Sequence, residues 1–252
     1  INDFKFKLAE GIVNGSIKYN FPTQNANILV HMKNSNAQIM ADTLFNIQNQ
    51  IYGSVTGDVE LNCNAKTQES CTKTLTGNGY FIVENGRMPK LGSLEYLLKA
   101  GNLLKGGITG LSINGIIDLI TPLKTGEFES ISGNMNFADG VAQSINIYSN
   151  GKDLNMYLKG TYDFSTYIAD MNVYGTLSNN ITSVFGKMKN LSLNTLFNTI
   201  PLMNKSELNP EIMSEINKIP NLDSQNIYRI FNAEINGDIN GNDYVKTFRW
   251  IK

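Results

Sequence analysis

Hydrophobic and polar residues alternate along much of this chain with a period of two, the spacing of a β-strand that has one apolar face. Between Ile51 and Cys63 the odd positions are apolar residues or glycine, and the even positions carry mostly polar side chains. The segment from Leu154 to Phe164 follows the same rule. Further strands are predicted around residues 4–8, 28–32, 75–83, 131–137, 167–175 and 231–237, and a last strand should include Tyr244, Phe248 and Trp250.

Asn-Gly and Asp-Gly pairs recur among these predicted strands. Such pairs accept the positive φ that tight hairpin turns require. Hairpins in succession build an antiparallel meander with one wet face and one apolar face. The sequence therefore predicts a mainly β protein with short helices, in which a curved antiparallel sheet forms a half-open barrel or groove. The predicted turns are Asn14-Gly15, Asn85-Gly86, Asp139-Gly140, Asn150-Gly151 and Asn236-Gly237.

Four segments depart from the strand pattern and predict short amphipathic helices that lie on the sheet or cap it. They are residues 91–104 after Pro89, 113–120 before Pro122, 193–200 before Pro201, and 210–216 from Pro210. The first could plug the end of a groove or touch a membrane. No low-complexity linker divides the chain, so residues 1–252 are interpreted as a single domain, with a possible soft seam near residues 66–73.

The net charge and the lengths of the apolar runs argue against two classes of protein. The net charge is −1 and the 21 basic residues are scattered, which argues against nucleic-acid binding. No run approaches the roughly 18 apolar residues that a spanning helix needs. Because the chain begins at Ile1 rather than Met, we expect a piece of a longer protein, with any signal or anchor upstream.

The two cysteines, Cys63 and Cys71, flank a polar loop. If strands pair across that loop, a disulfide is geometrically reasonable and would imply an oxidising compartment. Two free thiols near a loop are the alternative.

Candidate reactive groups are sparse. His31 is the single histidine, and its place in a strand-like run indicates a surface or edge residue rather than a catalytic base. Gly77 and Gly79 lie inside a predicted strand, where glycine favours a bend or a close approach over a nucleotide-binding loop. No cluster of cysteine and histidine suggests a metal site. We therefore expect a protein that is not an enzyme and has no cofactor or metal.

Several motifs follow one another between residues 72 and 164: Gly77-x-Gly79-Tyr80-Phe81-Ile82-Val83-x-Asn85-Gly86, a leucine-rich helix, Phe128-x-x-Ile131-x-Gly133-x-Met135-x-Phe137-x-Asp139-Gly140, and two alternating strands. This order of motifs resembles the C-terminal region of the AsmA-like family of Gram-negative envelopes. The resemblance implies an open, β-taco-like groove with a hydrophobic interior and no catalytic residues. It also implies a periplasmic protein with an upstream inner-membrane anchor, which helps move phospholipids between the two membranes or maintains the outer membrane.

An interior that holds acyl chains should be apolar and free of charge, because a buried unpaired charge is costly. Methionine suits such an interior, because its flexible side chain adapts to variable ligands. A closed protein core would produce the same pattern, and a structural or adhesive β domain of a surface protein is the alternative function. The candidate lipid-contacting residues, expected to share one interior surface, are Phe81, Val83, Met135, Phe137, Ile145, Ile147, Leu154, Met156 and Leu158.

Overall fold

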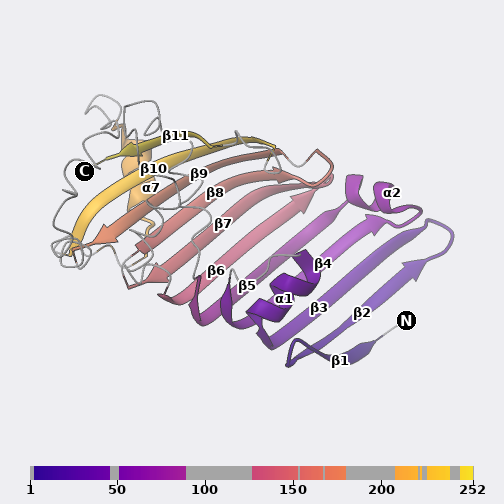
Figure 1. The fold of residues 1–252 in the computed structure, drawn as a ribbon. Helices are drawn as coiled ribbons and strands as arrows, with labels where there is room; N and C mark the ends of the chain where they lie inside the picture. Colours follow the sequence, from indigo (N-terminus) through magenta and orange to yellow (C-terminus); the bar gives the residue numbers. More distant parts are fainter. Residues whose placement is uncertain are drawn as a thin grey trace, which may run out of the picture.

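The computed structural model describes residues 3–45, 51–88, 127–152, 154–166, 168–179, 208–220, 222, 226–238 and 245–251. Within them, eleven strands form one antiparallel sheet whose spatial order is the order along the chain (Figure 1). The strands are β1 (Phe4–Leu8), β2 (Gly11–Asn20), β3 (Asn25–Asn36), β4 (Tyr52–Asn64), β5 (Thr76–Arg87), β6 (Glu127–Ala138), β7 (Val141–Gly151), β8 (Leu154–Asp163), β9 (Ile168–Ser178), β10 (Ile227–Asp238) and β11 (Val245–Trp250). The described helices are α1 (Ala37–Phe45), α2 (Gln68–Lys73) and α7 (Pro210–Ile216).

The sheet is curved and remains open. β1 and β11 stand at its two ends and do not pair with each other, so the strands do not close into a barrel (Figure 1). Each strand pairs with its neighbour in the sequence, as expected where hairpins follow one another. The predicted mainly β fold with a curved antiparallel sheet is confirmed.

The predicted turns had mixed outcomes. Asp139-Gly140 does connect β6 to β7, and Asp139 has the positive φ of 51° that such a turn needs. Asn150-Gly151 ends β7, immediately before the turn to β8. The predictions at Asn14-Gly15, Asn85-Gly86 and Asn236-Gly237 are wrong, because these pairs lie inside β2, β5 and β10.

Close packing and strand irregularity explain two of these errors. A Cβ atom on Gly15 would stand 1.9 Å from the carbonyl oxygen of Leu29 on β3, so this position needs glycine within a strand. Asn85 has a φ of 50°, and the register between β4 and β5 shifts beside it. A residue that accepts positive φ can therefore mark a strand irregularity instead of a chain reversal.

The helix beginning at Pro210 is confirmed as α7, which Asn209 caps by accepting a 2.8 Å hydrogen bond from the Ile212 backbone N–H. Helices α1 and α2 were not predicted. α1 starts where Asn36 Oδ1 accepts a 3.0 Å bond from the Gln38 N–H, and α2 occupies the proposed seam, between two strands that pair with each other. The other predicted helices (91–104, 113–120 and 193–200) and Tyr244 lie outside the described residues.

Cys63 and Cys71 form a disulfide that ties the end of β4 to α2. Cys63 is buried, and the bond closes a short loop of sequence separation 8. It holds α2 against the same end of the sheet that carries the turn between β2 and β3, where Ala65 donates a backbone hydrogen bond to Gln24.

Removing this bond should lower stability by about 2 kcal/mol, because an open loop of this length gives the unfolded chain more freedom. Urea unfolding with and without reductant measures the effect. A protein with Cys63→Ala and Cys71→Ala should be insensitive to reductant. Equal midpoints for the oxidised and reduced wild-type protein would contradict the expectation.

None of the helices in the described ranges has the length and apolar character needed to cross a membrane.

Candidate functional site

One face of the sheet is apolar across all its strands. Partners opposite each other in antiparallel strands point their side chains to the same side, so the register sorts residues into rows. One row consists of Phe6, Val13, Met32, Gly57, Phe81, Gly133, Ile147, Leu158, Val173, Ala233 and Phe248. The next consists of Phe4, Gly15, Val30, Val59, Gly79, Met135, Ile145, Gly160, Met171 and Ile235. Neither row contains a charged residue; we call this side of the sheet the apolar face.

All nine candidate lipid-contacting residues lie on the apolar face. Five of them belong to these two rows, and Val83 and Met156 belong to a third row that passes through Ile131 and Ser149. Phe137 pairs with Gly77, and Leu154 with Leu177, on the same side. The residues therefore share one surface, and their contact with lipid stays a prediction.

Large aromatic rings fill the space above glycines on neighbouring strands of this face. A Cβ atom on Gly133 would stand 2.5 Å from the Phe81 ring, and one on Gly175 would stand 2.2 Å from the Phe231 ring. Each glycine therefore lets a ring approach the backbone of the adjacent strand. The glycines of the face are part of its packing.

Burial differs along the apolar face. Val83, Ile145 and Leu154 are buried, while the other six candidates are half-buried. Beneath α1, Ala37 packs with Val83, Phe128 and Ile131 as a closed core. At β1, the first strand, the face is accessible, and Phe6 is 48% exposed. The two alternatives, closed core and accessible surface, thus occur in different parts of one face.

The opposite, polar face carries most of the hydrogen-bonding side chains. On it His31 Nδ1 lies 2.6 Å from Asp58 Oδ1, and both side chains are about half exposed or more. His31 is a surface residue as predicted, and it lies on β3, an interior strand of the sheet. Within the described ranges no group of three or more histidine, cysteine or acidic residues could hold a metal ion.

Helix α7 covers part of the polar face, on the other side of the sheet from α1 (Figure 1). There Tyr157 stacks between Tyr148 and Tyr174, with ring centres 4.9 and 6.3 Å away, and packs with Ile216 of α7. Burial raises the pKa of the Tyr157 phenol, which donates a 2.8 Å hydrogen bond to Asn146 Oδ1. This cluster was not predicted from the sequence, because a tyrosine at a polar-face position of an alternating strand is also compatible with a face that is exposed to solvent.

One carboxylate fixes α7 to the sheet. Glu215 is buried, and its Oε1 atom lies 3.0 Å from the Nζ atoms of both Lys159 on β8 and Lys218 beyond the helix. Burial acts to raise the pKa of Glu215, but the hydrogen bonds and charges of the two lysines outweigh it and hold that pKa below its usual value.

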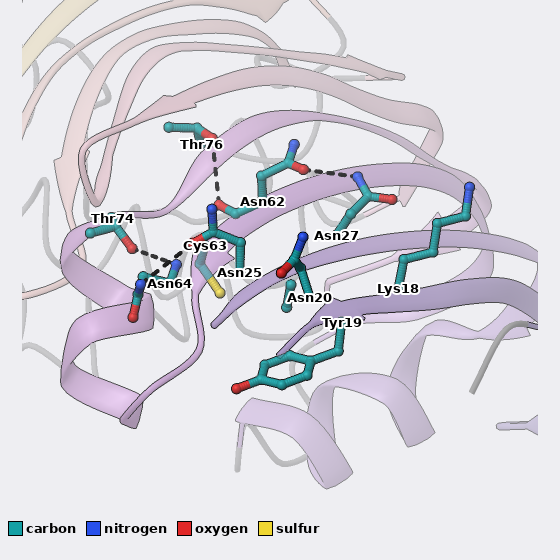
Figure 2. Close-up of a pocket in the computed structure, with 11 residues that line it drawn as sticks. Lys18, Tyr19, Asn20, Asn25, Asn27, Asn62, Cys63, Asn64, Thr74 and Thr76 are labelled. Atoms are coloured by element: carbon teal, nitrogen blue, oxygen red, sulfur yellow. Dashed lines mark hydrogen bonds between the residues drawn. The ribbon is translucent and has the colours of Figure 1, made fainter. Parts of the chain in front are cut away.

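A polar cleft of about 600 Å³ lies at the disulfide end of β2–β5 (Figure 2). Asparagine amides dominate it: Asn27 Nδ2 donates a 2.9 Å bond to Asn62 Oδ1, and Asn64 Nδ2 donates to the Thr23 carbonyl oxygen at 3.2 Å. Thr76 also donates to the Asn62 backbone oxygen. These bonds connect strand ends to the neighbouring turns. The cleft could not be found from the sequence, because its residues come from four strands and a loop.

Comparison with known proteins gave no match to a family model, a curated protein or a solved structure.

Proposed function

We propose that this protein is a non-enzymatic, lipid-handling module whose apolar face contacts acyl chains. The proposal places it in the Gram-negative envelope as an AsmA-like protein, where it would contribute to phospholipid transport between the inner and outer membranes or to outer-membrane homeostasis. A periplasmic location with an upstream membrane anchor belongs to the same proposal. The Cys63–Cys71 disulfide supports an oxidising compartment.

The observation that carries the proposal is the apolar face, in which the row from Phe6 to Phe248 crosses all eleven strands of an open sheet without a charged residue. Ten inter-strand steps make this face on the order of 48 Å wide. Acyl chains need apolar contact along their length and no hydrogen-bond partners, and head groups can stay in water at the rim. Methionine side chains such as Met32, Met135 and Met171 adapt to chains of different shape.

Mass spectrometry of lipids extracted from the purified protein tests the proposal. We expect phospholipid to copurify at a defined stoichiometry and to survive washing of the bound protein. A soluble β protein without an accessible apolar face, expressed and purified in parallel, sets the background. Lipid at background level, together with a stable lipid-free protein, would contradict the proposal and favour a structural or adhesive β domain.

A further inference from the structure

A second cleft, of about 410 Å³, lies at the opposite end of β4–β6 from the disulfide. Its walls are Tyr52 at the start of β4, residues 85–87 at the end of β5, residues 127–129 at the start of β6, and Lys152 after β7. The register sets Arg87 between Tyr52 on one side and Glu127 on the other. Three neighbouring strand ends therefore bring aromatic and charged groups together.

Arg87 is held in place by an aromatic ring. Its guanidinium carbon lies 4.6 Å from the centre of the Tyr52 ring, and no carboxylate in the described part of the chain forms an ion pair with it. Stacking on an aromatic ring fixes the plane of a guanidinium and leaves its N–H edge available. The N–H groups on that edge can donate two parallel hydrogen bonds to one phosphate group.

The acidic residues of the cleft have their own partners. Glu127 Oε2 lies 3.5 Å from Lys152 Nζ, in an exposed and loose pair, and Glu129 Oε2 accepts a 3.0 Å hydrogen bond from Asn150 Nδ2. Two cationic and two anionic side chains line the cleft, so their charges cancel. A simple anion would be attracted by Arg87 and Lys152 and repelled by both glutamates, whereas a ligand with a phosphate and an ammonium group would be attracted by both signs of charge.

We propose that this cleft binds a zwitterionic phosphate–ammonium headgroup of the phosphoethanolamine class. The phosphate contacts Arg87 and Lys152, and the ammonium group contacts Glu127 and Glu129. As a lipid site, the cleft rests on the proposed function for the attached acyl chains. The polar side chains of the cleft surround Phe128, which lies between the cleft and the apolar face.

Phe128 links the cleft to the apolar face. Its ring fills the space above Gly86, where a Cβ atom would stand 2.3 Å away, and it packs with Val83 and Ile131. A headgroup in the cleft would therefore lie next to the part of the apolar face that packs beneath α1, and the rest of the lipid would have to pass beside this packed part to reach the accessible surface.

The first test compares lipid classes that copurify with the full chain from a host whose membrane contains phosphatidylethanolamine and phosphatidylglycerol. We expect the wild-type protein to be enriched in phosphatidylethanolamine relative to the host membrane. Arg87→Gln should reduce that enrichment about tenfold, because one bidentate charge-assisted contact is lost. Total bound lipid should change little, and Lys66→Gln, at the disulfide end, should retain the preference.

The second test separates the headgroup from the chains. Glycerophosphoethanolamine, glycerol phosphate and inorganic phosphate are each titrated into delipidated protein, and NMR shifts of the Tyr52 and Arg87 signals are followed. We expect saturable shifts with glycerophosphoethanolamine that Arg87→Gln abolishes, and weaker responses to the two simple anions.

The outcomes distinguish the two proposals. Bound lipid with the host's composition and no response to glycerophosphoethanolamine would overturn the headgroup site and leave the lipid-handling function standing. A response to glycerophosphoethanolamine without any copurified lipid would support the cleft as a site for the free headgroup and contradict the lipid function. A stronger response to inorganic phosphate would overturn the zwitterionic preference.

Discussion

Met135→Asp should abolish most lipid binding, whereas Asn134→Asp, one residue away, should leave it unchanged. Both substitutions place a carboxylate in the same strand, but Met135 lies on the apolar face between Gly79 and Ile145, and Asn134 is exposed on the polar face. An unpaired charge among apolar groups is costly, so we expect Met135→Asp to reduce bound lipid at least about tenfold and stability by roughly 2–4 kcal/mol. Lipid extraction and urea unfolding measure the two effects.

Met135→Gln keeps this prediction testable if the aspartate variant does not fold. Glutamine has a length similar to methionine and no charge, so the sheet should form, while the amide still disfavours contact with acyl chains. Circular dichroism checks the fold of each variant before lipid is counted. Equal lipid content in folded Met135→Gln, Asn134→Asp and wild-type protein would show that this part of the apolar face does not contact lipid.

Much of the sheet could be predicted because period-two alternation is visible within a single strand, even when the strands that pair with it are unknown. Turn chemistry was less informative. Asp139-Gly140 reverses the chain, whereas Asn14-Gly15 lies in a strand because the backbone of β3 passes too close for any side chain on Gly15. Local sequence cannot distinguish these uses of glycine, since the deciding contact comes from another strand. β2 was missed for this reason.

The shared face of the nine candidate residues followed from alternation within each strand, yet their alignment into rows depends on register. A slip of one residue between β6 and β7 would have moved Ile145 and Ile147 to the polar face. The α7 contact was not predictable, because Glu215, Lys159 and Lys218 resemble ordinary surface charges. Only the packing of Ile216 against Tyr157 and Tyr174 shows that this surface is covered.

Glu215→Ala should destabilise the protein by about 3 kcal/mol, because it removes the acid that two lysines share at a buried contact. The expected loss is at the low end for a buried pair, since the side chains of Lys159 and Lys218 are 33% and 45% exposed. Glu211→Ala, on an exposed position of the same helix, should cost less than about 1 kcal/mol. Urea unfolding of both variants at neutral pH makes the comparison.

The same carboxylate predicts how the loss depends on pH. The lysines hold the folded-state pKa of Glu215 below its usual value of 4.5, so the unfolded chain takes up the proton first as the pH falls. The charge-dependent stabilisation is therefore present above pH 4.5 and is lost as the pH falls through the lower folded-state pKa. Glu215→Gln keeps the shape without the charge, so the stability difference between it and the wild-type protein should shrink over that acidic window. A difference that stays constant from neutral pH into the acidic range would show that Glu215 acts through packing and hydrogen bonds alone, and that its charge does not hold α7 on the sheet.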